Sequence, residues 1–200
     1  QHRIRDLECD ERFRYVLIFK NFGKAAGASL EHSHSQLVAL PVLPRKIESE
    51  MVGALTYYKY KERCIFCDII HQELKQDVRV VCKNKYFITI SPFAPRTPFE
   101  MWILPKHHNS SYTDQSEESL ADLVRIFSES LQRLDACISN VSYNFVLHTQ
   151  PLRSQPMNHF HWHFEIVPKL TSIAGFEWGS GFYINPMPPE DTWKYLKEAM

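Results

Sequence analysis

Two histidine segments constrain the fold of this 200-residue chain more than any other feature of the sequence. The first is His32-Ser33-His34-Ser35-Gln36 and the second is His159-Phe160-His161-Trp162-His163, and each is followed at the same spacing by a proline, Pro41 or Pro168. A β-rich run precedes each of them. Because self-similar segments indicate a repeated structural unit, the sequence predicts two copies of one strand–loop–strand module.

The surroundings of the two copies predict how the chain divides. Three short runs bounded by turn residues, 78–82, 86–91 and 99–104, precede the second copy and predict strands. A helix with apolar residues at the 3.6-residue period is expected from Ser116 to Leu134. We expect an α+β fold of two related antiparallel-sheet units with flanking helices. Residues 1–60 would be the C-terminal part of a truncated first unit, and residues 61–200 a second, complete unit.

Composition narrows the classes of partner and compartment. The 23 basic and 23 acidic side chains cancel, which argues against a nucleic-acid groove or an anionic membrane surface. No apolar run reaches the ~18 residues of a membrane span, and the first residues do not resemble a signal peptide. Five cysteines, two of them in a CxxC, suit a reducing compartment better than a disulfide framework. The expected location is therefore the cytoplasm.

The first histidine segment has the composition of a phosphate site. If it forms a strand, His32, His34 and Gln36 point to one side, because strand side chains alternate. Polar groups beside a core need a metal, a phosphate or one another as partners. The small-residue loop 21–29 just upstream would let a backbone approach a bulky anion closely. A phosphate site containing a nucleophile or base is predicted, and a strand with surface histidines is the simpler alternative.

A second group of residues has the character of a metal site. Cys64 and Cys67, with one histidine from residues 105–108 and one from residues 159–163, make a possible Cys₂His₂ zinc site. A redox role for the CxxC is weaker, because no thioredoxin-like strand and helix are expected around it. Another set, Glu50, His148, His161 and His163, has the mixed carboxylate and imidazole character of an iron or zinc site. Both sets remain open at this stage.

These motifs resemble the galactose-1-phosphate uridylyltransferase family of the histidine triad superfamily, and its ADP-glucose phosphorylase-like branch in particular. The resemblance covers essentially the whole chain. It rests on Asn21 with Gly27-Ala28-Ser29, on His32-Ser33-His34-Ser35-Gln36, on Cys64-Ile65-Phe66-Cys67 and on 161–168, with 174–177 and 183–186 in addition. It implies histidine-triad-like sheet units. The serines between the histidines favour the phosphorylase-like side, since uridylyltransferases proper carry Pro and Gly there.

The resemblance also implies roles for individual residues. His34 falls on the family's nucleophile, and His32 on a ligand of a zinc whose cysteines lie upstream of this chain's first residue. A second zinc would use Cys64, Cys67, His108 and His161, as in family members with this CxxC, whereas uridylyltransferases proper use the positions of Glu50, His148, His161 and His163. Substrate contacts fall on Asn21, Gly27, Ala28, Ser29 and Gln36 for the nucleotide, and on Ser172, Ile173, Ala174, Gly175, Phe176 and Glu177 for the hexose phosphate.

The expected activity is that of a nucleotidyltransferase. It would move a nucleoside monophosphate between a nucleotide sugar and a sugar 1-phosphate or phosphate through a covalent nucleotidyl-histidine, as in UDP-glucose–hexose-1-phosphate uridylyltransferase. Phosphorolysis of ADP-glucose or of a dinucleoside polyphosphate is the alternative within the family. A zinc-stapled nucleotide-binding module without turnover is the alternative from another class. Family members are homodimers, and the aromatic residues Trp162, Phe176, Trp178, Phe182 and Tyr183 would supply apolar surface for one. The alternative is that these aromatic residues belong to the core.

Overall fold

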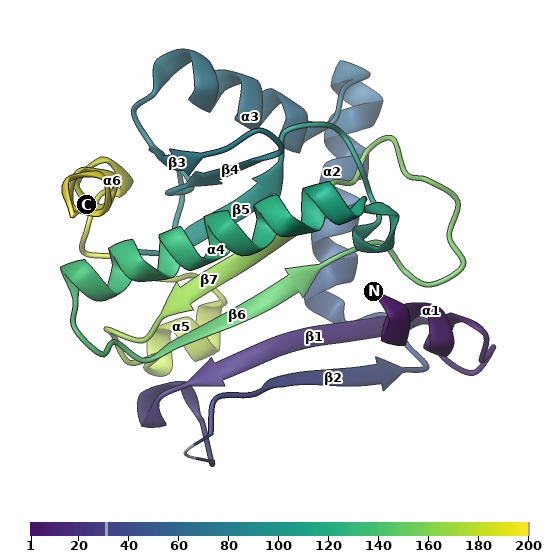
Figure 1. The fold of residues 1–200 in the computed structure, drawn as a ribbon, viewed down its shortest axis with the longest axis horizontal. Coiled ribbons are helices and arrows are strands. Elements are labelled where there is room, and N and C mark those ends of the chain that lie inside the picture. Colours follow the sequence, from purple (N-terminus) through teal and green to yellow (C-terminus); the bar gives the residue numbers. More distant parts are fainter. Residues whose placement is uncertain (31, 200) are drawn as a thin grey trace.

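The structure is a computed structural model that describes residues 1–30 and 32–199. Its centre is one antiparallel sheet of seven strands in the order β2-β1-β6-β7-β5-β4-β3 (Figure 1). In chain order the strands are β1 Tyr15–Phe22, β2 Ser35–Leu40, β3 Val80–Lys83, β4 Phe87–Ile90, β5 Met101–Pro105, β6 Tyr143–His148 and β7 His163–Pro168. The expected α+β class, an antiparallel sheet with flanking helices, is confirmed.

The two repeated modules meet in the middle of this sheet. β1 pairs with β6 in antiparallel register, with Ile18 opposite Leu147 and Phe22 opposite Tyr143. Each module contributes a strand pair, β1–β2 or β6–β7, so the strands of residues 1–60 and those of residues 61–200 form one continuous sheet. The division into two related units stays a prediction. β2 lies at one edge of the sheet, and β3 lies at the other.

Helices cover the two faces of the sheet unequally (Figure 1). Strand alternation sends Ile103 to the core under the long helix, with Ile126, and sends Leu104 to the opposite core, with Phe66. Ser116 caps the long helix by accepting a hydrogen bond from the Ser119 N–H, as its sequence predicts. The helices are α1 His2–Glu8, α2 Arg45–Lys61, α3 Ile65–Gln76, α4 Glu117–Cys137, α5 Gly175–Ser180 and α6 Pro189–Glu198, with 3₁₀ turns η1 Lys24–Ala26 and η2 Tyr112–Asp114.

The histidine segments depart from the expected strands. β2 begins at Ser35 and β7 begins at His163, so His32, His34 and His161 all precede the strand that follows them. The prediction that His32 and His34 lie on a strand is wrong. The β1–β2 ladder ends at the Lys20–Ser35 pair, because the chain turns away shortly after it at Gly23, which has φ of 81°.

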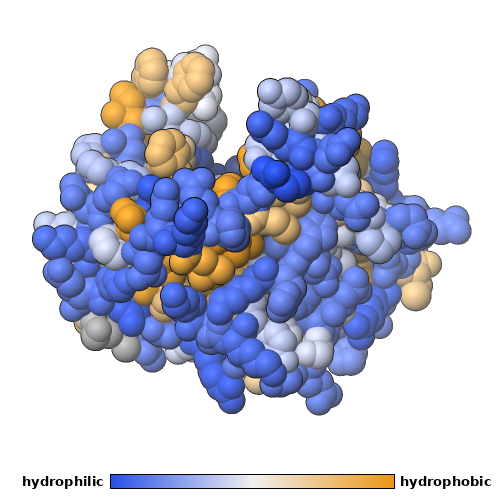
Figure 2. Space-filling view, turned by 90° about the horizontal axis from the view of Figure 1, so that it is seen from above, coloured by the Kyte–Doolittle hydropathy of each residue, from blue (hydrophilic) through white to orange (hydrophobic). Residues whose placement is uncertain are grey.

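The sheet face that carries α2 and α3 is left partly open. These two helices pack over one end of the face, with Ile47 and Met51 of α2 in the core. α5 lies behind β6 and β7 on the same side of the sheet (Figure 1), and Figure 2 shows the surface hollowed between two lobes. Within the part of the chain described, no helix is both long enough and apolar enough to cross a bilayer.

Candidate functional site

The small-residue loop after β1 encloses a cavity of about 490 Å³, here called the loop cavity. Gly23 has φ of 81°, and a Cβ on it would lie 2.1 Å from the Ser142 hydroxyl, so only glycine fits this turn. Asn21 accepts a hydrogen bond of 2.8 Å from Asn144, which also donates to the Ala26 carbonyl and so fixes the loop to the sheet. The lining residues are Asn21, Phe22, Gly23, Lys24, Ala28, Ser29, Leu30, His32, Ser33 and Asn140.

His34 stands just before β2, half-buried, with one ring nitrogen fixed. Its Nδ1 lies 2.8 Å from the His32 carbonyl. Because a carbonyl only accepts hydrogen bonds, Nδ1 carries the proton and Nε2 of the neutral ring keeps its lone pair. This is the tautomer that a nucleophilic histidine requires at Nε2. Gln36 follows within β2, opposite Phe19 of β1.

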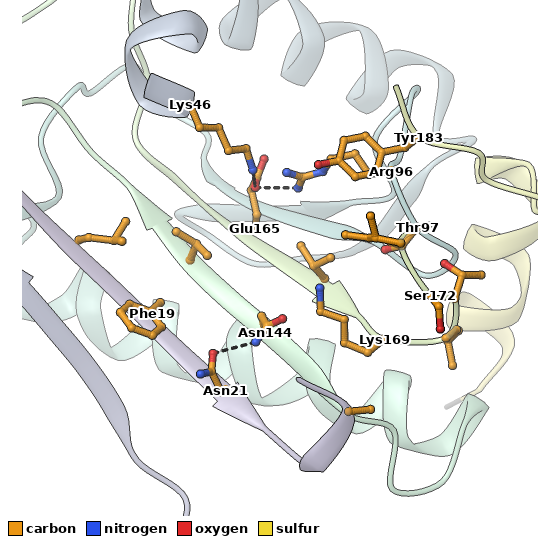
Figure 3. Close-up of a pocket in the computed structure, with 17 residues that line it drawn as sticks. Phe19, Asn21, Lys46, Arg96, Thr97, Asn144, Glu165, Lys169, Ser172 and Tyr183 are labelled. Atoms are coloured by element: carbon orange, nitrogen blue, oxygen red, sulfur yellow. Dashed lines mark hydrogen bonds and ion pairs between the residues drawn. The ribbon is translucent and has the colours of Figure 1, made fainter. Parts of the chain in front are cut away.

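A larger cavity of about 740 Å³, here called the sheet cavity, lies on the open face of the sheet (Figure 3). Its floor is formed by side chains of β1, β6 and β7, and Lys46 at the start of α2 lies at its rim. Asn21 lines both cavities, so the two adjoin at this residue. The lining residues are Leu17, Phe19, Asn21, Ala25, Lys46, Arg96, Thr97, Asn144, Val146, Glu165, Val167, Lys169, Leu170, Thr171, Ser172, Ile173 and Tyr183.

The six residues expected on the hexose-phosphate side are divided by the structure. Ser172 and Ile173 line the sheet cavity, together with Asn21 from the nucleotide group. The other four, Ala174, Gly175, Phe176 and Glu177, form the start of α5 and are not in its lining, and Glu177 closes the first turn by accepting from the Ala174 N–H at 3.0 Å. Phe176 is 55% exposed. The last four residues of this segment therefore lie outside the cavity, three of them exposed and Glu177 half-buried.

Cys64, Cys67, His108 and His161 come together as expected from the sequence. Each offers one ligand atom, and these atoms all lie within 4.8 Å of one another. Cys67 Sγ is 3.3 Å from His108 Nδ1 and 3.6 Å from His161 Nδ1. The other ring nitrogens are held by carbonyls, His161 by Pro105 at 2.9 Å and His108 by Met157 at 3.1 Å. Both Nδ1 atoms are therefore directed at the thiols. The carbonyls at Nε2 fix the orientation of the two rings, as hydrogen-bond partners of the other ring nitrogen do for metal-binding histidines.

The electrostatics of this group suit a cation. A hydrogen bond from Cys67, followed by those from His108 and His161, lowers the pKa of the Cys64 thiol well below its usual range. Cys64 is the N-cap of α3 and Cys67 lies in its first turn, where the helix dipole also favours negative charge. Two sulfurs and two imidazole nitrogens at these distances are the donor set that a closed tetrahedral zinc site uses. The residues present therefore fit zinc.

Glu50, His148 and His163 form a second group of possible metal ligands, separate from the cysteine group. Glu50 lies 2.5 Å from His148 Nδ1 and 3.4 Å from His163 Nε2. Burial lowers the pKa of His148, but the neighbouring Glu165 and Glu50 carboxylates outweigh it and raise that pKa to about 9. His161 turns to the cysteines instead, so the four-residue alternative is not assembled as one set. What remains is a carboxylate and two imidazoles whose ligand atoms lie within 4.8 Å of one another, with Glu50 paired to His148.

Several polar residues of the sheet cavity escaped the sequence reasoning. Lys46, Arg96 and Lys169 come from three separate segments, and nothing local in the sequence marks them as a group. Glu165 did carry a signal, since a carboxylate within the apolar strand 163–168 needs a partner.

Helix α3 was also missed by the sequence reasoning, although its buried residues Phe66, Ile70 and Glu73 follow helical spacing. A helix thus follows the CxxC, but α2 rather than a strand precedes it.

Comparison with known proteins places the chain in a family. A family model described as a domain of unknown function (DUF4921) matches residues 2–200. Among curated proteins, ADP-glucose phosphorylase of Arabidopsis thaliana is 36% identical over 199 residues, with 98% of this chain and 55% of that protein covered. Galactose-1-phosphate uridylyltransferase of Thermotoga maritima is 31% identical over 205 residues, with 98% and 64% covered. The chain thus spans about half to two thirds of the length of these relatives.

Solved structures agree with the sequence relatives. The crystal structure of the Arabidopsis thaliana ADP-glucose phosphorylase with bound ADP-glucose superposes with a TM-score of 0.92 at 36% identity, and covers 98% of this chain and 63% of that one. A structure of a uridylyltransferase gives a TM-score of 0.93 at 33% identity, covering 99% and 64%. The resemblance expected from the histidine and cysteine motifs is therefore confirmed.

Proposed function

The chain belongs to the family described as a domain of unknown function (DUF4921), and from this premise we propose that it is part of a nucleotidyltransferase with His34 as its nucleophile. The observation that carries the proposal is the fixed ring of His34, the residue that directly follows His32 and Ser33 of the loop cavity's lining. A lone pair at Nε2 and a glycine loop able to approach phosphate are the two parts that nucleotidyl transfer needs at one place. The names of the two relatives, a uridylyltransferase and an ADP-glucose phosphorylase, support this class of reaction.

The reaction runs in two steps in this proposal. Nε2 of His34 attacks the α-phosphorus of a nucleotide sugar, a P–N bond forms, and the bond to the sugar phosphate oxygen breaks, with that oxygen keeping the electron pair. An oxygen of a second phosphate then attacks the phosphorus, and the P–N electron pair returns to Nε2. Gln36 and the N–H groups near Ala28 and Ser29 stabilise charge on the phosphoryl oxygens. Asn21 and Gly27 hold the nucleotide side.

Two donors compete within this proposal. UDP-glucose with a hexose 1-phosphate acceptor corresponds to the uridylyltransferase relatives, and ADP-glucose with phosphate corresponds to the phosphorylase relative. Identity to the phosphorylase is the higher of the two, 36% against 31%. That difference and the serines between His32, His34 and Gln36 favour ADP-glucose as the first donor to test. Phosphorolysis of a dinucleoside polyphosphate would use the same histidine.

Zinc is the cofactor we propose, held by Cys64, Cys67, His108 and His161. When bound, it supplies a closed structural cross-link rather than a reacting group, because all four ligand positions are filled by the protein. The histidines then tie the loop after β5 and the segment before β7 to the start of α3. His32 is exposed and is proposed as a ligand of a further zinc together with cysteines from outside this chain.

A homodimer is proposed for the intact protein. Apolar side chains stand exposed between residues 170 and 184, among them Trp178 at 80% and Phe182 at 71%. Exposed apolar surface on this scale marks an interaction site. Trp162, in contrast, is fully buried in the core and takes no part in this surface. Sedimentation of the intact protein should give a dimer, and a monomer at every concentration would contradict the proposal.

The test of the proposed function is a covalent adduct. Intact protein is incubated with ADP-glucose or UDP-glucose labelled in the α-phosphate, quenched and digested. We expect a stoichiometric, acid-labile label on the peptide that contains His34, and none in His34→Asn protein. Nucleotide-sugar binding without any label in the wild type would instead establish the zinc-stapled binding module.

A further inference from the structure

We propose that Asn144 is a positioning residue for nucleotidyl transfer, because it turns the side-chain amide of Asn21 so that the nitrogen faces the small-residue loop and can donate to a phosphoryl oxygen. This inference rests on the proposed function and extends it to a distant part of the chain. Asn144 lies on β6, directly opposite Asn21 in the β1–β6 ladder and 123 residues away in sequence. The loop and His34 both lie within residues 1–60.

One backbone carbonyl fixes the orientation of both amides. Nδ2 of Asn144 lies 2.9 Å from the Ala26 carbonyl oxygen and 2.8 Å from Asn21 Oδ1. Because a carbonyl oxygen only accepts hydrogen bonds, the atom of Asn144 that faces Ala26 must be the nitrogen. That nitrogen also donates to Asn21, so the atom of Asn21 that it meets must be the oxygen (Figure 3). Nδ2 of Asn21 is therefore turned away from Asn144.

The nitrogen of Asn21 borders the space beside a glycine of the loop. Gly27 has φ of 81°, and a Cβ on it would lie 4.0 Å from Asn21 Nδ2. Within residues 1–30 and 32–199, this nitrogen donates to no protein acceptor. Asn21 also lines both the loop cavity and the sheet cavity. An unused amide donor beside an open glycine, where the two cavities adjoin, is suited to an anionic oxygen.

The second hydrogen bond of Asn144 holds the loop itself. Ala26 is the buried residue of the 3₁₀ turn η1, and the small residues 27–29 follow it directly. Asn144 therefore sets both the position of the loop and the atom of Asn21 that faces an anion. Rates of group transfer depend steeply on such placement, since a shift of about 1 Å in a reacting or stabilising group can cost roughly 10²-fold. Loss of Asn144 should therefore slow the reaction even though it touches no phosphoryl oxygen in this proposal.

Asn144→Asp tests the inference, because it keeps the shape of the side chain and removes its donors. The amide of Asn21 then turns its nitrogen to the new carboxylate and leaves its oxygen facing the phosphate. Rapid-quench rates of adduct formation from ADP-glucose labelled in the α-phosphate are measured on the intact protein for wild type, Asn144→Asp, Asn144→Ala, Asn21→Ala and the double variant of Asn144→Asp with Asn21→Ala. Asn84→Asp is the matched control, since Asn84 also donates to a backbone carbonyl, that of Asp122 at 2.7 Å, but lines neither cavity. Thermal melts establish that each variant is folded.

We expect Asn144→Asp and Asn21→Ala each to slow adduct formation roughly 10²-fold, the cost of one charge-stabilising donor, and Asn84→Asp to keep the wild-type rate. Asn144→Ala adds no charge and leaves the Asn21 amide free to turn, so a loss of about tenfold is expected. The double variant should be no slower than its slower parent, because both changes remove the same donor. Losses that multiply in the double variant, or a wild-type rate in Asn144→Ala, would overturn the positioning role.

Failure of the proposed function gives a different pattern, which binding of ADP-glucose to the same variants reveals by calorimetry. If the wild type forms no adduct, but Asn144→Ala weakens binding in the presence of Asn21 and not in Asn21→Ala protein, nucleotidyl transfer is wrong and the positioning role stands. If the adduct forms equally fast in wild type and in both Asn144 variants, the transfer stands and the positioning role is wrong. A wild type that neither reacts with ADP-glucose nor binds it would contradict both.

Discussion

The two histidine segments have the same spacing and opposite environments. His161 and His163 are 0% exposed, whereas His32 is exposed and His34 is half-buried. The second segment runs through the interior, where Trp162 packs between Phe87 and Tyr112. The first segment precedes an edge strand and borders the loop cavity. The same motif is therefore buried in the core in one copy and exposed at the surface in the other.

This difference teaches what each copy can do. A buried imidazole is fixed by its neighbours and suits a structural ligand, as in the pairing of His161 with Pro105 and Cys67. A nucleophile must reach substrate and needs a nitrogen without a proton, and the tautomer with the proton on Nδ1 leaves Nε2 of His34 in that state. The predictions below change one copy at a time, so that chemistry and stability can be separated.

The largest effect is expected at the cysteines beside the buried copy. Cys64→Ser or Cys67→Ser should lose zinc from the second site and much of the folded signal, because the binding energy of a structural zinc, on the order of 10 kcal/mol, is also folding energy. Elemental analysis and thermal melts measure the two losses. Cys82→Ser is the control, since Cys82 is buried away from the ligands and contacts Ser130. Variants that melt like the wild type without zinc would contradict the ligand assignment.

A paired substitution at equivalent places comes next. His34→Asn should lower turnover by several orders of magnitude while zinc content and melting temperature stay unchanged, because it removes only the attacking nitrogen. His161→Asn, at the same position of the other copy, should lose zinc and stability. Steady-state kinetics and elemental analysis of both variants decide the comparison. Equal loss of zinc in the two would make His34 a structural residue.

Much of the fold could be predicted because local patterns and tertiary packing agree. The 3.6-residue period of α4 reflects its one buried face, and the β-rich composition of β1 and β6 reflects strands paired on both sides within the sheet, so the sequence carries the signal. Residue type and order also predicted that Cys64 and Cys67 meet one histidine from 105–108 and one from 159–163, whereas the choice of His108 and His161 came from the family resemblance. The start of β2 could not be predicted, since it depends on where the ladder with β1 ends.

The sheet cavity marks the limit of the sequence for the site. Lys46, Arg96 and Lys169 are brought together by the packing of α2, of the loop before β5 and of the chain after β7 against one sheet. Each is an ordinary surface residue by its local sequence. Only the three-dimensional arrangement shows that Lys46 and Arg96 share Glu165 and that Lys169 does not.

A smaller effect is expected at the group formed by Glu50, His148 and His163. Glu50→Gln should cost about 3 kcal/mol of unfolding free energy, because His148 would lose one of the two carboxylates that hold its charge. Zinc content should stay unchanged, since Glu50 is not among the proposed ligands. Urea denaturation measures the first and elemental analysis the second, with Glu48→Gln on the exposed side of α2 as control. Loss of metal on Glu50→Gln would favour the alternative ligand set.

The smallest effect is expected at the last residue of the exposed copy. Gln36 lies in β2 opposite Phe19, and we propose that its amide donates to a phosphoryl oxygen as charge develops on it. Gln36→Ala should therefore still form the adduct on His34, but roughly 10²-fold more slowly, the cost typical of one charge-stabilising donor. Rapid-quench measurement of adduct formation isolates this step. Ser35→Ala, one residue earlier and exposed, is the matched control and should keep the wild-type rate. An unchanged rate in Gln36→Ala would leave stabilisation of the phosphoryl oxygens to the loop N–H groups near Ala28 and Ser29, whereas complete loss of the adduct would show that Gln36 positions His34 itself.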